Sequence, residues 1–243
     1  METVLVVGAT GNIGVSAVQA ALHSGLQVLA IVRNQASAEK LFLHLGTRDR
    51  IITVEADITS DSGVRSVVDR VKDGKLPPFQ HVYSAAYLRQ IMNVNFESNF
   101  CKSAIRSTLM HDDELMSGAV AYRDTVPYLL QQNHPKATWT LCTGASGDWG
   151  LRAAPGMTQG ALFAMANVGC RDNADTNVRF NEVYLACRVE VDSSAKKTGA
   201  MKASDFAPVY EVILSKPEIK GCRISVHGPA DLKDLKVKKK FEA

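Results

Sequence analysis

The sequence predicts a single α/β domain of the Rossmann type, with a doubly wound parallel sheet. Short apolar runs rich in β-branched residues alternate with helical patterns along the whole chain of 243 residues. Strands alternate with crossover helices in this way when a sheet is parallel. The first run, at 4–7, leads directly into three glycines spaced G-x-x-G-x-x-G, and a helical pattern follows. We expect residues 1–243 to form one domain, because no stretch remains for a second one.

The remaining elements follow in order along the chain. We expect strands at 27–32, 50–55, 80–84, 137–142, 178–187 and 221–227. We expect helices at 15–22, 36–45, 62–71, about 95–106, 113–132, 159–168 and 203–214. Lysines crowd the end of the chain, and we interpret that segment, which includes Lys236 and Lys240, as a solvated tail.

Composition excludes several classes of protein. The net charge of +3 is mild and no basic stripe is interleaved with aromatic residues, so we expect no nucleic-acid partner. The five cysteines are scattered without a C-x-x-C pair, which favours reduced thiols in the cytoplasm over a disulfide framework or a zinc site. The six histidines form no pair at ligand spacing, so we predict no metal site. We also expect no signal peptide and no membrane-spanning segment.

The three glycines form the most informative motif. Gly8 permits a tight turn out of the strand, Gly11 lets a pyrophosphate approach the backbone, and Gly14 lets the following helix pack on the sheet. The helix N-terminus offers unpaired N–H groups to phosphates. This context, between a strand and a helix, favours a dinucleotide site over a glycine-rich turn that holds nothing. The cofactor-binding residues expected in this turn are Gly8, Thr10, Gly11, Asn12, Ile13 and Gly14.

The residues after the second strand indicate which dinucleotide is bound. NAD-binding proteins place an acidic residue there to bind the ribose diol, whereas this chain has Arg33 followed by Asn34. A guanidinium group forms charge-assisted hydrogen bonds to a 2′-phosphate, which an acid would repel. We therefore expect NADP(H) rather than NAD(H), the alternative being that Arg33 is an ordinary surface arginine.

Two further strand ends complete the predicted cofactor site. Asp57, followed by Ile58, is placed to accept a hydrogen bond from the adenine amino group. The small residues Ser84, Ala85 and Ala86 follow the next strand and let the backbone approach the cofactor.

Over essentially its whole length the chain resembles the short-chain dehydrogenase/reductase superfamily. The resemblance rests on the turn at 8–14, Asp57-Ile58, Ser84-Ala85-Ala86, Tyr122-Arg123-Asp124-Thr125-Val126-Pro127, Thr140-Leu141-Cys142-Thr143 and the closing residues Ser204-Asp205-Phe206-Ala207 and Val226-His227-Gly228. The glycine spacing is that of extended and atypical members. The resemblance implies an oxidoreductase with a small-molecule substrate. Together with two amphipathic helical stretches, at about 95–106 and 113–132, it implies a homodimer or homotetramer.

The chain departs from this superfamily at its catalytic tetrad of Asn, Ser, Tyr and Lys. The Ser position falls on Thr143, which keeps a hydroxyl group. The other positions fall on Glu114 or Asn95 for Asn, on Pro155 or Gly156 for Tyr, and on Gln159 or Gly160 for Lys. No tyrosine occurs between Tyr128 and Tyr184, and no lysine between Lys136 and Lys196. The usual proton-delivering pair is therefore absent.

This absence favours substrates whose reduction needs no proton donor. Reducing a ketone places negative charge on oxygen, whereas hydride transfer to an iminium carbon neutralises an existing cation. Asp148, just past the fifth strand, is the candidate partner of such a cation, and Thr143 is a secondary hydrogen-bonding group. The alternative for Asp148 is a loop residue making local backbone bonds. Trp149 offers a flat, cation-tolerant wall unless it serves only packing. Tyr87 would reach the nicotinamide or substrate unless it is an ordinary loop tyrosine.

The missing tetrad, with an acid and a tryptophan after the fifth strand, resembles fungal short-chain dehydrogenase-like enzymes of indole-alkaloid biosynthesis. In those enzymes NADPH reduces a cyclic iminium, and the same site can steer a cycloaddition. The resemblance implies an NADPH-dependent reductase in natural-product biosynthesis. Two alternatives stay open: a non-redox cyclase or isomerase of the Diels-Alderase type, and a dinucleotide-sensing regulator like the NmrA-like proteins. The chain is shorter than such regulators tend to be, which disfavours the second.

Overall fold

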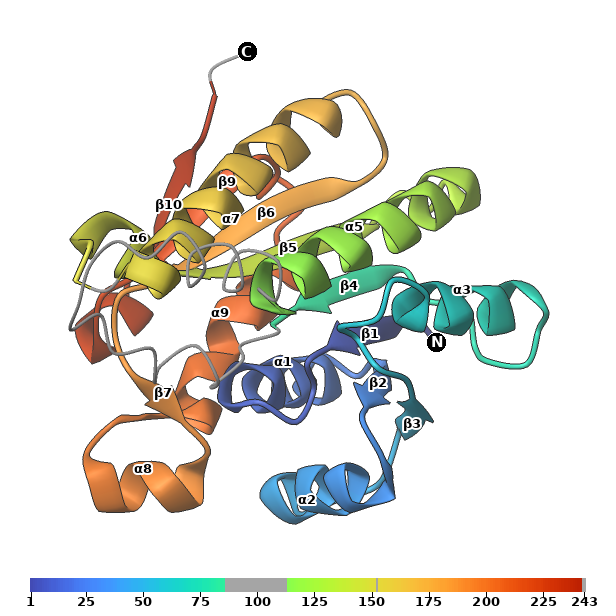
Figure 1. Ribbon diagram of the computed structural model, residues 1–243, viewed down its shortest axis with the longest axis horizontal. Coiled ribbons are helices and arrows are strands. Elements are labelled where there is room, and N and C mark those ends of the chain that lie inside the picture. The colour runs from blue at the N-terminus through green and yellow to red at the C-terminus, as the bar shows by residue number, and fades with distance from the viewer. Residues whose placement is uncertain (86–112, 152, 242–243) are drawn as a thin grey trace, which may run out of the picture.

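A mostly parallel sheet of eight strands forms the centre of the protein (Figure 1). The computed structural model describes residues 1–85, 113–151 and 153–241. The strand order is β10-β9-β6-β5-β4-β1-β2-β3, and only β10 pairs antiparallel to its neighbour. The strands are β1 (Thr3–Val7), β2 (Gln27–Val32), β3 (Ile51–Glu55), β4 (His81–Ser84), β5 (Thr138–Gly144), β6 (Arg179–Leu185), β9 (Cys222–Val226) and β10 (Lys236–Lys239). The order reverses between β1 and β4, where a doubly wound sheet binds its ligand. The predicted fold class is confirmed.

Helices cover both faces of the sheet and create two apolar cores. The first face carries α1 (Asn12–His23), α2 (Gln35–Leu45) and α9 (Ala203–Ser215), and the second carries α3 (Gly63–Lys72), α5 (Asp113–Gln132) and α7 (Ala153–Asp172) (Figure 1). Trp139 and Phe180 stack in the second core, with ring centroids 5.0 Å apart. Because burial of such rings contributes strongly to stability, this core fixes β5 and β6 against α7.

The alternation of side chains along β5 and β6 determines which groups meet at the ends of these strands. Trp139 pairs in register with Phe180, and Thr143 with Tyr184. Side chains two residues apart along a strand lie on the same face. Thr143 and Tyr184 therefore lie side by side on the face covered by α7, at the carboxyl ends of both strands.

The start of α7 corrects the sequence prediction. We predicted a helix at 159–168, but α7 begins at Ala153, after a separate short helix, α6 (Ser146–Trp149). Pro155 lies in the first turn of α7, where its missing N–H group has no partner to lose. Gly156 permits close contact with α6, because a Cβ atom there would lie 3.3 Å from the Ser146 carbonyl oxygen.

The segment after β6, for which we predicted no element, folds into a small unit of its own. Strands β7 (Val189–Glu190) and β8 (Met201–Lys202) pair in parallel around helix α8 (Asp192–Thr198).

The lysine-rich tail, which we interpreted as a solvated segment and for which we predicted no element, requires a correction. It follows the 3₁₀ helix η2 (Pro229–Leu232) and forms the exposed edge strand β10, in addition to the predicted last strand. Charged side chains on an edge strand discourage pairing with other chains.

Two further expectations concern a helix before α5 and the absence of a membrane-spanning segment. The helix expected at about 95–106 lies outside the described residues. Within the residues that are described, no helix has both the length and the apolar character needed to cross a membrane.

Candidate active site

The glycine turn brings the end of β1 into direct contact with the start of α1. Gly8 has a φ of 84°, and its carbonyl oxygen accepts a hydrogen bond of 3.1 Å from the Gly11 N–H group. A Cβ atom on Gly14 would lie 2.0 Å from that same oxygen, so only glycine fits there. Within the described part of the chain, no side chain caps the N-terminus of α1. This turn fits the diphosphate of a dinucleotide, because its backbone is unobstructed and its first helical N–H groups lack a capping partner.

The other residues of the turn have different surroundings. Asn12 is exposed, and its Oδ1 accepts a hydrogen bond of 3.1 Å from the backbone N–H group of Val191, which ties the turn to the start of α8. Ile13 is half-buried against the core of the first face, and Thr10 is half-buried as well. The Asn12 side chain thus has a structural partner of its own.

The two residues after β2 differ in role. Asn34 caps α2, since its side chain accepts a hydrogen bond of 3.0 Å from the Ser37 N–H group. Arg33 is exposed. Asp57 Oδ1 accepts hydrogen bonds from the Thr59 N–H and hydroxyl groups, at 3.0 and 2.8 Å. These bonds lower the pKa of Asp57, and the charge of Arg33 adds to that effect.

The end of β4 lies against the glycine turn. Ser84 is buried, and the Ala85 N–H group donates to the Val7 carbonyl oxygen at 3.0 Å. The Ala85 carbonyl oxygen would lie 4.0 Å from a Cβ atom on Gly11. Ile58, after β3, is half-buried against the core of the second face. Ala86 and Tyr87 lie outside the described residues.

Thr143 belongs to a buried network of charges that the sequence did not predict. Its hydroxyl group donates to Glu182 Oε1 at 2.7 Å. Glu182 is fully buried, accepts two hydrogen bonds from Arg223, at 2.9 and 3.0 Å, and is paired with Lys240. Such pairing is what allows a carboxylate to be buried. Because the Thr143 proton points to Glu182, its oxygen can only accept a hydrogen bond from another group.

Gln159, at the position expected for the family's lysine, holds the end of β5. It is buried, and its Oε1 accepts a hydrogen bond of 2.6 Å from the Gly144 N–H group. An amide does not titrate, so Gln159 cannot lower the pKa of a neighbouring acid as a lysine does.

Asp148 lies on α6, and its partner is a tyrosine that sequence reasoning missed. The Tyr184 hydroxyl group donates to Asp148 Oδ2 at 2.7 Å. Burial and the adjacent carboxylate raise the pKa of Tyr184 to about 12, so the phenol stays protonated at neutral pH. Its only sequence signal is its place near the end of a strand, in register with Thr143.

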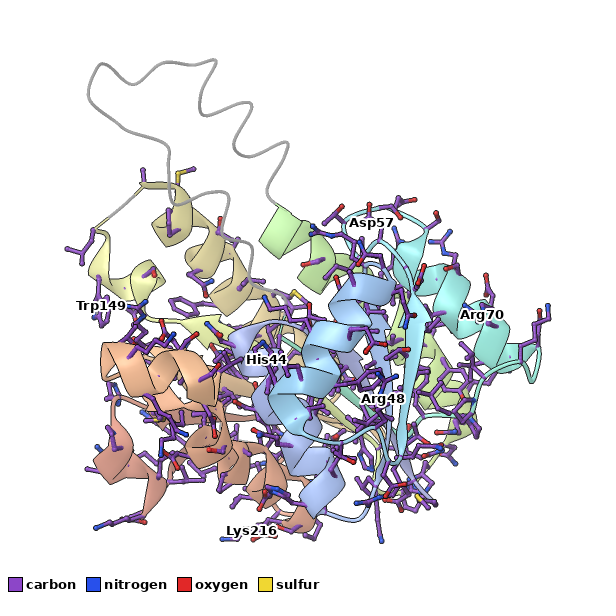
Figure 2. The ribbon with its side chains drawn as sticks, turned by 90° about the horizontal axis from the view of Figure 1, so that it is seen from below. His44, Arg48, Asp57, Arg70, Trp149 and Lys216 are labelled. Carbon is purple, nitrogen blue, oxygen red and sulfur yellow. The ribbon has the colours of Figure 1, made fainter. Side chains whose placement is uncertain are left out.

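The surface beside Asp148 is apolar. Trp149 is 57% exposed, and Leu151 and Met157 are exposed as well. Figure 2 places Trp149 at the outer edge of the molecule, on α6 and well separated from Asp57. Among the described residues, no group of three His, Cys, Asp or Glu side chains is arranged to hold a metal ion.

Comparison with known proteins places this geometry in a family. The family model for short chain dehydrogenases matches residues 2–120. The short-chain dehydrogenase/reductase iacG of Pestalotiopsis fici is 48% identical over 255 aligned residues, which cover 97% of this chain and 95% of the relative.

Solved structures share the fold at low identity. A short-chain dehydrogenase/reductase of the glucose/ribitol dehydrogenase type from Brucella melitensis has a TM-score of 0.73 at 18% identity, covering 94% of this chain and 96% of its own. ElxO with NADP bound has a TM-score of 0.77 at 12% identity, covering 95% and 99%. A short chain oxidoreductase from Pseudomonas aeruginosa PAO1 with an atypical catalytic center has a TM-score of 0.72 at 14%, covering 93% and 96%. The nearly full-length match to the Pestalotiopsis fici protein, together with the shared fold, shows that this chain belongs to the short-chain dehydrogenase/reductase family of oxidoreductases.

Proposed function

We propose that the protein is an NADP(H)-dependent reductase of a small organic substrate with an iminium-type electrophile, acting in natural-product biosynthesis. One observation carries the proposal: Asp148 follows β5, where the family's tyrosine and lysine are missing, and the Thr143 hydroxyl group donates its proton to Glu182. A carbonyl substrate needs donors there, whereas an iminium ion needs an anion and acceptors.

The residues present fit NADP(H). The glycine turn at 8–14 would hold the diphosphate, and the exposed Arg33 would pair with the 2′-phosphate. ElxO, which shares the fold, was solved with NADP bound, and this supports the same cofactor here. When bound, the reduced cofactor supplies the hydride.

The chain's own residues would bind and orient the substrate. The Asp148 carboxylate would attract the iminium cation, and the Thr143 oxygen would accept a hydrogen bond from an iminium N–H group. The exposed ring of Trp149 would cover an apolar part of the substrate and exclude water from the reacting carbon. The resemblance to fungal alkaloid enzymes supports a role in natural-product biosynthesis.

The test compares a cyclic imine, such as a dihydroisoquinoline, with the ketone of the same ring system. We expect loss of NADPH absorbance only with the imine. Asp148→Asn keeps the size of the side chain and removes its charge, so kcat/KM should fall about tenfold to a thousandfold, roughly 1.4–4 kcal/mol. Asp49→Asn is the matched control, because Asp49 is exposed in the loop before β3, and its activity should equal that of the wild type.

Other outcomes would contradict this proposal. Equal turnover of imine and ketone would show that an unidentified proton donor operates. Product formed without loss of NADPH would favour a non-redox cyclase or isomerase, and cofactor binding without any turnover would favour a regulator. Assembly as a homodimer or homotetramer and a cytoplasmic location stay predictions.

A further inference from the structure

We infer that Tyr184 is the positioning residue of this site: its phenol holds the Asp148 carboxylate in one orientation, with Oδ1 left to meet a cationic substrate. The identity of the substrate rests on the proposed function. The contact between the two side chains rests on the geometry alone.

Asp148 needs such a restraint because its own element is short. Helix α6 has four residues and is capped at its C-terminus by Gly150, whose φ is 60°. Asp148 is exposed, so its side chain would otherwise sample several rotamers in water. A charge that must be in place before the substrate arrives is more effective when its orientation is fixed in advance.

Tyr184 can supply the restraint because it comes from the rigid part of the molecule. It lies in the central strand β6 and is 6% exposed. Its ring is packed against Phe163 of α7 and against His227, with centroids 5.9 and 5.8 Å away. The Arg223 guanidinium lies 4.8 Å from the ring centroid and is itself fixed by Glu182.

The direction of the hydrogen bond also matters. The pKa of Tyr184 is raised, so the phenol donates and the carboxylate accepts across the neutral range. The bond engages Oδ2, and no described residue donates to Oδ1. One carboxylate oxygen is therefore anchored to the sheet, and none of the described residues competes with a substrate N–H group for the other.

The hydrogen bond between Tyr184 and Asp148 is compatible with two roles of Tyr184, a structural role and a positioning role. A structural residue would use the bond only to fasten α6 to β6, and its loss would change stability without changing which ligands bind. A positioning residue would change the discrimination between cationic and neutral ligands. The experiment therefore measures a ratio of affinities rather than stability.

The first measurement uses isothermal titration calorimetry on the protein saturated with NADPH, from which neither probe can accept a hydride. The two probes are tetrahydroisoquinoline, which is cationic at neutral pH, and tetralin, its neutral carbocyclic analogue. We expect Tyr184→Phe to reduce the preference of the wild type for the cation by about tenfold, since a hydrogen bond to a charged group is worth at least that much. Asp148→Asn should abolish the preference, and the double variant should equal Asp148→Asn. Tyr128→Phe is the matched control, because Tyr128 packs against Phe79, apart from the site, and should change nothing.

The second measurement does not depend on any ligand. Tyrosines isotope-labelled at Cζ report the hydrogen bonding of each phenol by NMR, and the Tyr184 signal is the one that Tyr184→Phe removes. We expect Asp148→Asn to move that signal and to leave the Tyr128 signal in place.

The two measurements separate the possible failures. An unmoved Tyr184 signal in Asp148→Asn would overturn the inference, and so would an unchanged cation preference in Tyr184→Phe. A wild-type protein with no preference for the cation would overturn the proposed function. The positioning of Asp148 by Tyr184 would then stand or fall by the NMR result.

Discussion

Arg33 is the residue to which we assign the expected preference for NADP(H). It is exposed directly after β2, whereas its neighbour Asn34 is engaged in capping α2. The positive charge of Arg33 attracts the Asp57 carboxylate and so helps to lower the pKa of Asp57. A positive side chain at the end of β2, close to the glycine turn, favours a cofactor that carries an additional phosphate.

Arg33→Asp should reverse this preference. It removes a charge-assisted hydrogen bond, worth roughly 1.5–3 kcal/mol, and adds repulsion toward the 2′-phosphate. We expect the affinity for NADPH to fall about tenfold to a hundredfold while the affinity for NADH is kept or improved. Titration of both cofactors into both proteins measures this.

The matched control is Arg70→Asp, which makes the same change of charge in the last turn of α3 (Figure 2). It should leave both affinities unchanged. Equal affinities of the wild type for NADPH and NADH would contradict the assignment of Arg33.

At the residue scale, local signals could be predicted and long-range contacts could not. Gly8 and Gly14 could be assigned to the turn between β1 and α1, because the conformation and the close contact that require glycine there depend only on the adjacent strand and helix. Thr143 and Glu182 are 39 positions apart, and Tyr184 and Asp148 are 36 apart. Only the register of β5 against β6 brings these pairs together, and a sequence does not state a register between distant strands.

At the scale of elements, the joint between β1 and α1 depends on one glycine. A methyl group on Gly14 would lie 2.0 Å from the Gly8 carbonyl oxygen, a backbone atom that cannot rotate away. Gly14→Ala should therefore destabilise the protein by about 1–3 kcal/mol or more and weaken NADPH binding. Denaturant unfolding measures the first effect, and cofactor titration the second.

Gly160→Ala is the control for this substitution. Gly160 is exposed within α7, and a Cβ atom there would meet nothing within 4 Å. The same change should stabilise the protein by up to about 1 kcal/mol, because alanine favours a helix interior. Equal effects of both substitutions would show that the close contact at Gly14 can relax.

The elements that sequence reasoning missed are short ones. Strands β7 and β8 have two residues each, and α6 has four, so none of them is long enough for its pattern to repeat. Longer elements such as α1 and β2 show several repeats of their pattern and were predicted to within a few residues. Strand β10 was not predicted, because its lysine-rich sequence shows no apolar alternation. It is held by pairing with β9 rather than by burial of an apolar face.

At the scale of the whole molecule, the sheet separates the candidate site from a second group of polar residues. The candidate residues lie at the carboxyl ends of the strands. His81 begins β4 at the amino end, where it is buried and contacts Thr138 Oγ1 at 3.0 Å and Glu2 Oε2 at 3.2 Å. Changes at His81 should therefore affect stability without touching the chemistry.

His81 should make the stability of the whole fold depend on pH. Burial lowers its pKa from 6.5 to about 4, against an opposing effect of Glu2. Between pH 6.5 and 4 the unfolded chain binds a proton that the native state does not, so the free energy of unfolding is highest above pH 6.5 and falls as the pH decreases toward 4. The expected loss is about 2–4 kcal/mol. Denaturant unfolding at a series of pH values should show a shallower decline in His81→Gln, since glutamine cannot take up that proton. Parallel curves for both proteins would mean that His81 accepts a proton in the native state about as easily as in the unfolded chain.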